Sequence, residues 1–414
     1  MTATQEPLAG SRPALLQHRS FVAYWCARTA TNGAYQMQAV AVGWQIYELT
    51  GSAFDLGLVG LVQFFPVVVL GIVVGHMADR YDRRIVVGTC QVIKALAAAA
   101  FAVGTIGGFL SRDTMLAILF VSGTARAFET PTMHTLVPGV VPPQLLPRAI
   151  AASATASQTA TICGPAIGGL MYAFGAATVY LTCTAIFVLA SALISLIVLR
   201  GTPPEKKPVT METLFAGFSY IRHNRVVLGA ISLDLFAMLL GGVTALLPVY
   251  AKDVLVAGPW GLGLLRSAPA VGALVISVWL AHHQIERRTG HVLFTAVAVF
   301  GLATIVFAFS TSLAVSIAAL AVYGACDAIS VVIRHSLVQT RTPNDMLGRV
   351  MAVNFMFTGT SGTLGEFRAG SVAAGFGAFT SVLVGGIGAI VVAFLWMRWF
   401  PEIAQIDKIQ AQHN

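Results

Sequence analysis

Four carboxylates lie inside long apolar runs of this 414-residue chain, where an acidic side chain can carry a proton. An ionised side chain in the hydrocarbon of a bilayer costs about 2.5 to 3.5 kcal/mol on insertion scales, so it normally faces a partner or an aqueous cavity. A desolvated carboxylate can bind and release a proton at physiological pH. We therefore predict four candidate proton-coupling residues: Glu129, Glu366, Asp234 and Asp327.

Arginines lie in the same apolar runs, and five cations against four anions predicts ion pairing. They are Arg28, Arg126, Arg266, Arg334 and Arg368. Arg126 and Glu129 are three residues apart, so they share one face of a helix and can pair. We expect this pair to act in proton coupling or substrate contact, and a purely structural ion pair is the alternative.

Two further pairs follow from position in the runs. Asp327 and Arg334 are seven residues apart and share a helix face, with Arg334 near the end of its run. Asp234 and Arg28 lie at similar depths in corresponding runs of the two halves of the chain, so they are candidates for a pair between the halves that breaks during the transport cycle. Arg368 follows Glu366 by two residues and therefore points to a different face.

The composition is that of an integral membrane protein. Hydrophobic residues make up 57% of the chain and charged residues only 10%, whereas charged residues make up about 25% of a soluble domain. The net charge is +8, yet no basic segment interleaved with aromatic residues indicates nucleic-acid binding. All five cysteines lie in apolar runs and predict neither disulfides nor a metal site. No nucleophile elbow or P-loop is present, so we expect neither an enzyme nor ATP as the energy source.

The apolar runs predict an all-α protein with twelve transmembrane helices in two bundles of six. We expect bundles at 1–199 and 226–414, joined by a linker at 200–225 that contains a short amphipathic helix after a proline-rich segment. The predicted spans are 21–48, 54–76, 85–109, 114–137, 148–173, 177–199, 226–251, 260–283, 291–309, 313–338, 346–374 and 378–399.

The distribution of Lys and Arg predicts the orientation. The loops on the side of both termini hold seventeen of these cations, and the opposite loops hold only Arg112 and Lys252. Because cytoplasmic loops carry the excess of Lys and Arg, we expect both termini in the cytoplasm.

Residues 75–84, between the second and third spans, form a compact charged segment that we call the signature segment. Its pattern G-x-x-x-D-R-x-x-R-R is carried by Gly75, Asp79, Arg80, Arg83 and Arg84. It resembles the loop between helices two and three of major facilitator superfamily transporters. This resemblance implies a cytoplasmic gate, in which Asp79 contacts the start of helix eleven and releases it in the inward-facing state.

Other segments resemble the enterobactin-exporter-like branch of that superfamily. They are 45–52 followed by 57–61, and 342–354 at the entry to helix eleven. The resemblance implies a secondary active exporter that exchanges protons for siderophores, drugs or other amphipathic compounds in the cell membrane, with the proton gradient as energy source and no cofactor. A proton-coupled importer, a uniporter and a lipid-translocating protein remain as alternatives.

Gly164, Pro165, Gly168 and Gly169 on the fifth span resemble the end of the helix-five motif of drug:proton antiporters. Plain close packing of small residues is the alternative interpretation.

Polar and aromatic residues of the first two spans predict a pocket for an amphipathic organic molecule. The candidates are Asn32, Tyr35, Gln36, Phe64 and Phe65. We therefore expect a small organic substrate, protons and membrane lipids as partners, no nucleic acid, and a monomer.

Overall fold

The computed structural model describes residues 15–199, 211–283 and 287–407, and for residues 71–80, 211–215 and 344 it describes the backbone only. In these ranges every regular element is a helix. The first set of long helices is α1 (Arg19–Thr50), α2 (Ala53–Arg80), α3 (Arg83–Ile106), α4 (Arg112–Val140), α5 (Leu146–Tyr172) and α6 (Ala176–Ser195). The second set is α8 (Arg225–Gly241), α10 (Gly258–His282), α11 (Thr289–Phe309), α12 (Leu313–Arg341), α13 (Asn344–Phe376) and α14 (Ala378–Trp399).

These helices correspond to the twelve predicted spans. Eight segments of the described chain are long and apolar enough to cross a membrane by length and composition. The other four long helices, α1, α4, α5 and α13, have 32, 29, 27 and 33 residues and exceed the roughly 20 that a bilayer needs. Their lower hydropathy reflects the polar and small residues that they carry.

The seventh span is broken, which the apolar run did not predict. Helix α8 ends at Gly241 and is followed by a 3₁₀ turn η3 (Thr244–Leu246), the short α9 (Leu247–Val249) and a π-helical turn η4 (Tyr250–Val254). A Cβ on Gly242 would collide with the backbone of Gly365 on α13, so only glycine allows this close approach. Pro248 then removes a backbone donor from the next turn.

The signature segment is more helical than predicted. Helix α2 continues to Arg80, and the chain turns only at Tyr81 and Asp82. The Asp82 side chain accepts a hydrogen bond from the backbone N–H of Arg84 at 2.9 Å and so caps the first turn of α3.

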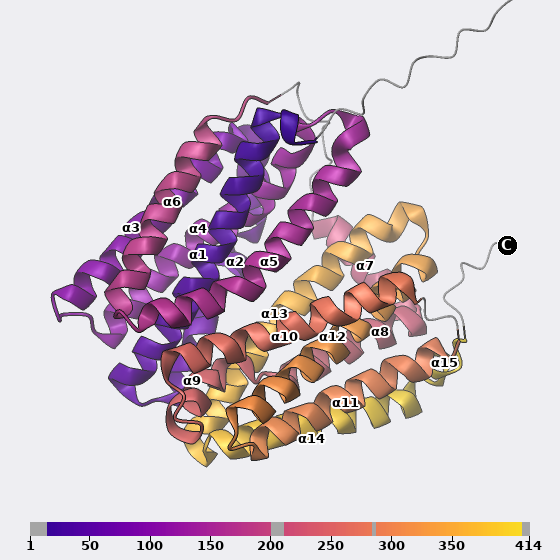
Figure 1. Cartoon of the computed structure of the whole chain (residues 1–414). Coiled ribbons are helices and arrows are strands. Elements are labelled where there is room, and N and C mark those ends of the chain that lie inside the picture. Colours follow the sequence, from indigo (N-terminus) through magenta and orange to yellow (C-terminus); the bar gives the residue numbers. More distant parts are fainter. Residues whose placement is uncertain (1–14, 200–210, 284–286, 408–414) are drawn as a thin grey trace, which may run out of the picture.

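The long helices form two bundles (Figure 1). Helices α1 to α6 pack against one another, and α8 to α14 form the second group. The amphipathic helix α7 (Met211–His223) packs on α8 and α13 of the second bundle, with Ile221 buried. The bundles meet along two seams, α5 with α10 and α2 with α13.

Close backbone contacts hold both seams together. A Cβ on Gly169 of α5 would lie 2.6 Å from the carbonyl oxygen of Pro259. A Cβ on Gly370 of α13 would lie 2.7 Å from the carbonyl oxygen of Ala53. Both contacts lie at the end of the molecule where α1 ends and α2 begins, which we call the closed side.

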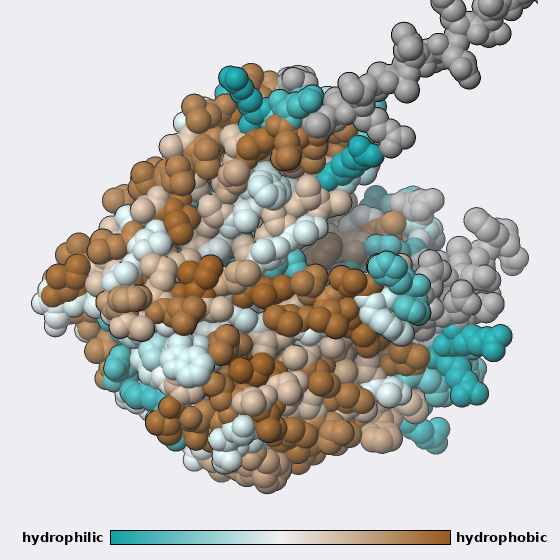
Figure 2. Space-filling model, viewed as in Figure 1, coloured by the Kyte–Doolittle hydropathy of each residue, from teal (hydrophilic) through white to brown (hydrophobic). Residues whose placement is uncertain are grey.

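The core is continuous between the bundles on the closed side and separate on the other side. The largest buried apolar cluster includes Phe101 and Tyr180 of the first bundle together with Leu262 and Phe307 of the second. Towards the start of α1, separate clusters fill each bundle, one around Phe21, Leu136 and Ile194 and one around Leu233, Phe294 and Ile333. Figure 2 shows the hollow between the bundles on this open side.

Candidate transport site

A buried ion pair joins α3 and α4 inside the first bundle. The ammonium of Lys94 lies 2.7 Å from Oε2 of Glu129, and the two side chains are 3% and 5% exposed. Nε2 of Gln91 donates to Oε1 of Glu129 at 2.6 Å and to the hydroxyl of Thr31 at 2.7 Å. No contact within 4.0 Å joins Arg126 to Glu129 in the described residues, so the predicted pair is wrong and Glu129 binds Lys94 and Gln91 instead.

Lys94 is the functional group that sequence reasoning missed. It is the only charged residue between Ile85 and Phe109, and that isolation was the available signal. Lys94 adds a sixth cation to the five arginines and four carboxylates that the sequence indicated inside the apolar runs.

Arg126 instead lies over an aromatic ring. Its guanidinium carbon is 3.7 Å from the ring centroid of Tyr35 on α1, a cation–π contact. The Tyr35 hydroxyl donates to Oε1 of Gln63 on α2 at 3.3 Å. The predicted pocket residue Tyr35 therefore joins a polar cluster between α1, α2 and α4.

Asn32 and Gln36, also predicted for the pocket, contact α5. Nδ2 of Asn32 donates to the carbonyl oxygen of Ser157 at 2.8 Å. A Cβ on Gly164 would lie 2.7 Å from Cβ of Gln36, so the two helices touch there. Both residues thus take part in packing between α1 and α5.

The two phenylalanines predicted for the pocket lie in different places. Phe64 is near the second bundle, 3.9 Å from a Cβ built on Gly359 of α13. Phe65 is 55% exposed and packs beside Phe120, which is 44% exposed. Phe120 is nine residues before the buried Glu129 and so lies on the opposite face of α4. Phe65 therefore faces the outer surface, contrary to the prediction.

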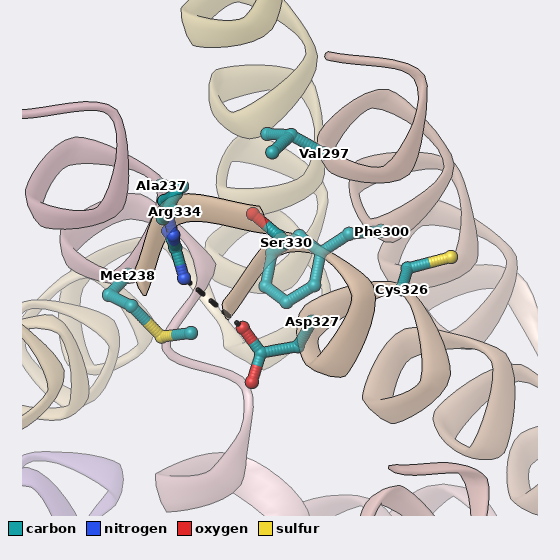
Figure 3. A pocket seen from close by; sticks show the side chains of 8 residues that line it. All are labelled: Ala237, Met238, Val297, Phe300, Cys326, Asp327, Ser330 and Arg334. Carbon is teal, nitrogen blue, oxygen red and sulfur yellow. Dashed lines mark ion pairs between the residues drawn. The ribbon is translucent and has the colours of Figure 1, made fainter. Parts of the chain in front are cut away.

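The second bundle contains its own ion pair. Nη1 of Arg334 lies 2.5 Å from Oδ1 of Asp234, and the hydroxyl of Thr358 donates to Oδ2 at 2.7 Å. Nη2 of Arg334 is 4.0 Å from Oδ1 of Asp327, so the predicted approach of Asp327 and Arg334 is confirmed (Figure 3). Arg334 links α8, α12 and α13 through these groups.

Asp327 lies at the edge of a small cavity. Its side chain is 32% exposed, and the cavity has a volume of about 10 Å³ lined also by Met238, Phe300 and Ser330 (Figure 3). This is space for about one water molecule. Asp327 is thus less enclosed than Asp234.

Two predicted charge partners, Arg28 and Arg368, bind neutral groups. Nη1 of Arg28 donates to the hydroxyl of Tyr24 at 2.7 Å, while Asp234 binds Arg334, so Arg28 and Asp234 are not paired in this state. The pair between the halves, expected to break during cycling, stays a prediction. Nε and Nη2 of Arg368 donate at 2.9 and 2.7 Å to carbonyl oxygens in the last turn of α8. These carbonyls have no helical partner where α8 stops, so Arg368 caps the break.

Glu366 lies on the seam between the bundles. Its Oε2 would be 2.9 Å from a Cβ on Gly60 of α2, and within the described residues no cation lies within 4.0 Å of it. Arg266 of α10 is close enough to act on Glu366 and Tyr35 electrostatically. The Arg266 guanidinium crosses to the first bundle, where Nη2 is 3.5 Å from a Cβ built on Gly43 of α1.

Part of the signature segment can be placed. Gly75 is described by its backbone alone, and the side chains of Asp79 and Arg80 lie outside the described part, as does the predicted contact of Asp79 with helix eleven. Nη1 of Arg83 donates to a carbonyl oxygen of α4 at 3.2 Å, and Nη2 of Arg84 lies 2.7 Å from Oδ2 of the carboxylate at position 82. Both arginines therefore stabilise the first bundle internally in this state.

The glycines of α5 serve two contacts. Gly164 and Gly168 touch α1, where a Cβ on Gly168 would lie 2.8 Å from Cα of Met37. Gly169 and the carbonyl of Pro165 touch α10 across the seam. The motif thus packs α5 both within its bundle and against the other one.

A hydrogen bond joins the bundles on the closed side, and the sequence did not predict it. The hydroxyl of Tyr47 at the end of α1 donates to Oδ2 of Asp253 on η4. Nζ of Lys252 lies 5.5 Å from the ring centroid of Tyr47. We call this group, Tyr47 with Asp253 and Lys252, the closed-side contact.

Residues 10–414 match the family model described as transmembrane secretion effector, a model of the major facilitator type. The chain belongs to the major facilitator superfamily. The resemblance inferred from the signature segment is thereby confirmed. Relatives of this major facilitator protein include the enterobactin exporter EntS of Citrobacter koseri, 26% identical over 407 residues and covering 95% of both chains. The enterobactin exporter of Escherichia coli O1:K1 is 24% identical over 407 residues and covers 96% of both chains.

Solved structures confirm the fold. A bacterial homologue of the human lysosomal transporter Spinster, in an inward-facing and unoccupied conformation, superposes with a TM-score of 0.75 at 14% identity, covering 95% of this chain and 99% of that one. A bacterial homologue of the iron transporter ferroportin, in an inward-facing state, superposes with a TM-score of 0.70 at 18% identity. The match covers 93% of this chain and 99% of that one. The major facilitator protein described here is a multi-pass membrane transporter and not an enzyme.

Proposed function

We propose that this transporter is a proton-coupled exporter of amphipathic organic compounds, siderophore-like or drug-like, and that it works by alternating access. The observation that carries the proposal is the position of Glu366. This carboxylate belongs to the second bundle but lies against Gly60 of the first, and no cation of the described residues is within 4.0 Å.

Glu366 suits proton coupling better than the other three carboxylates. Glu129 and Asp234 each have a cation at 2.7 and 2.5 Å within their own bundle, so their charges stay compensated when the bundles move. Asp327 has Arg334 at 4.0 Å. An ionised Glu366 without a cation within 4.0 Å is costly in this half-buried place between the bundles, whereas a protonated one fits there. Opening the seam admits water and permits ionisation, so seam opening and proton release are coupled.

The charge distribution and the relatives support export as the direction of transport. The open side is the side of the basic loops, which the positive-inside rule assigns to the cytoplasm. The described state would then take up substrate from the cytoplasm. The two enterobactin exporters, similar over about 95% of the chain, support export.

The test is pH-driven efflux in proteoliposomes loaded with enterobactin or with ethidium. We expect efflux that requires an inward proton gradient and stops when an uncoupler is added. Glu366→Gln should abolish the response to the gradient but still allow exchange of substrate between the two sides. Asp113→Asn is the matched control, because that side chain is 86% exposed at the start of α4.

Efflux of both probes that ignores the gradient and the uncoupler would contradict proton coupling. Normal gradient dependence in Glu366→Gln would remove this residue from the mechanism.

A further inference from the structure

Ion pairing within each bundle leaves an excess of positive charge at the bundle interface. Lys94 binds Glu129 and Arg334 binds Asp234, so neither carboxylate is available to another cation. Arg28 and Arg368 donate to hydroxyl and carbonyl oxygens instead. Arg126 and Arg266 remain, and in the described part of the chain neither has a carboxylate within 4.0 Å. Glu366 of the seam acts on Arg266 only from beyond that distance, so the two arginines still exceed the one carboxylate.

These two arginines approach the same helix from different bundles. Arg126 on α4 lies over the ring of Tyr35, and Arg266 on α10 lies against Gly43. Tyr35 and Gly43 are eight residues apart on α1, a separation of roughly 12 Å along the axis. Nε of Arg266 is buried and finds no acceptor among the described groups. A half-buried cation whose buried Nε has no acceptor is costly unless an anion can reach it.

We propose that Arg126 and Arg266 form a two-point site for an amphipathic organic anion, one acidic group being bound by each bundle. Guanidinium groups bind carboxylates and similar oxyanions through strong charge-assisted hydrogen bonds. Tyr35 adds an aromatic surface beside Arg126, which suits an aromatic body between the acidic groups. This substrate class rests on the proposed role in transport, and it means that the substrate itself connects the two bundles.

The test is equilibrium binding to the purified full-length protein in detergent, with no gradient applied. The probes are biphenyl-4,4′-dicarboxylate, the monoanion biphenyl-4-carboxylate and the uncharged biphenyl-4,4′-dicarboxamide. We expect the dianion to bind more tightly than the monoanion, and the diamide least tightly. Arg126→Gln or Arg266→Gln should weaken dianion binding by about 10- to 100-fold, the range for a lost charged hydrogen bond, and leave diamide binding unchanged.

Arg28→Gln is the matched control, since it removes a cation of the same kind from α1 that is bound to a tyrosine hydroxyl. It should keep the preference for the dianion. Arg126→Lys and Arg266→Lys should recover part of the affinity, because the charge is kept and the fork-shaped donor is lost.

A wild-type protein that does not bind the dianion, or binds the diamide as well, overturns the proposal even if the glutamine variants do not fold. An equal loss with Arg28→Gln also overturns it. Gradient-driven efflux without this anion preference would retain the exporter and remove the two-point site. Anion binding at the two arginines without any gradient-driven efflux would do the reverse.

Discussion

The pair of Lys94 and Glu129 makes the sharpest stability prediction. Both side chains are almost fully buried, 2.7 Å apart, and belong to one bundle. Removing one partner of a buried ion pair leaves an unpaired charge in a region of low dielectric constant, which costs about 3 to 5 kcal/mol. We therefore expect Glu129→Gln and Lys94→Met each to lower the free energy of unfolding by about 3 to 5 kcal/mol.

The double variant Lys94→Met with Glu129→Gln separates a structural pair from independent residues. Methionine fills the volume of the lysine stem, and the new amide oxygen can still accept the hydrogen bond from Gln91. If the two residues contributed independently, the double variant would lose about 6 to 10 kcal/mol. We expect a loss below about 1 kcal/mol, because replacing both charges together is often neutral.

The assay is reversible unfolding in mixed micelles by titration with dodecyl sulfate, with helical circular dichroism as the signal. Proton-driven efflux of the double variant should be retained. A double variant that loses the sum of the single losses would refute the structural role. A stable Glu129→Gln that has lost its response to the proton gradient would instead restore Glu129 as a coupling residue.

Three further predictions test the seams and a helix end. Gly169→Val places a side chain where a Cβ would already lie 2.6 Å from a backbone oxygen of α10, so efflux should be lost while membrane insertion persists. The control is Gly362→Ala, where a Cβ would meet nothing within 4 Å. It should behave as wild type in the same flux and expression assays. Tyr47→Phe removes a hydrogen bond between the bundles worth about 1 kcal/mol. Spin-label distances should show that the population ratio of the two states shifts roughly five-fold towards the one in which the bundles separate at Tyr47. Asp82→Ala removes the cap of α3 and should lower unfolding stability by about 1 kcal/mol at pH 7. The Arg84 guanidinium lowers the pKa of Asp82 in the folded protein. The stability difference between wild type and Asp82→Ala should therefore be complete above the unfolded pKa of about 3.9 and disappear as the pH falls through the lower folded pKa. Thermal unfolding at several pH values measures this.

The fold was predictable because hydropathy reports which segments enter the bilayer. The prediction of helix ends from hydropathy was wrong at two places, because a helix need not begin and end where the chain enters and leaves the bilayer. The signature segment is polar, yet α2 continues through it to Arg80, because a helix does not end where the membrane ends. The seventh span is apolar on both sides of Gly241, yet its helix ends there, where α13 approaches the backbone of Gly242. That break depends on a contact with a helix about 120 residues later, which no local pattern contains.

The ion pairs were less predictable than the helices. Spacing along one helix identified the approach of Asp327 to Arg334 but wrongly paired Arg126 with Glu129. The spacing was compatible with that pair, but Lys94 on a neighbouring helix occupied the carboxylate and Tyr35 bound the arginine. Competition between helices decides such partners.

The confinement of each ion pair to one bundle has an electrical consequence. Lys94 with Glu129, and Arg334 with Asp234, sum to zero charge, so rotation of either bundle carries no net charge across the membrane through them. Arg126 and Arg266 are not neutralised in this way, and moving one elementary charge through the membrane potential involves about 2.3 kcal/mol per 100 mV. The return step of the empty carrier should therefore depend on voltage, whereas a carrier loaded with a dianion should cross almost independently of it.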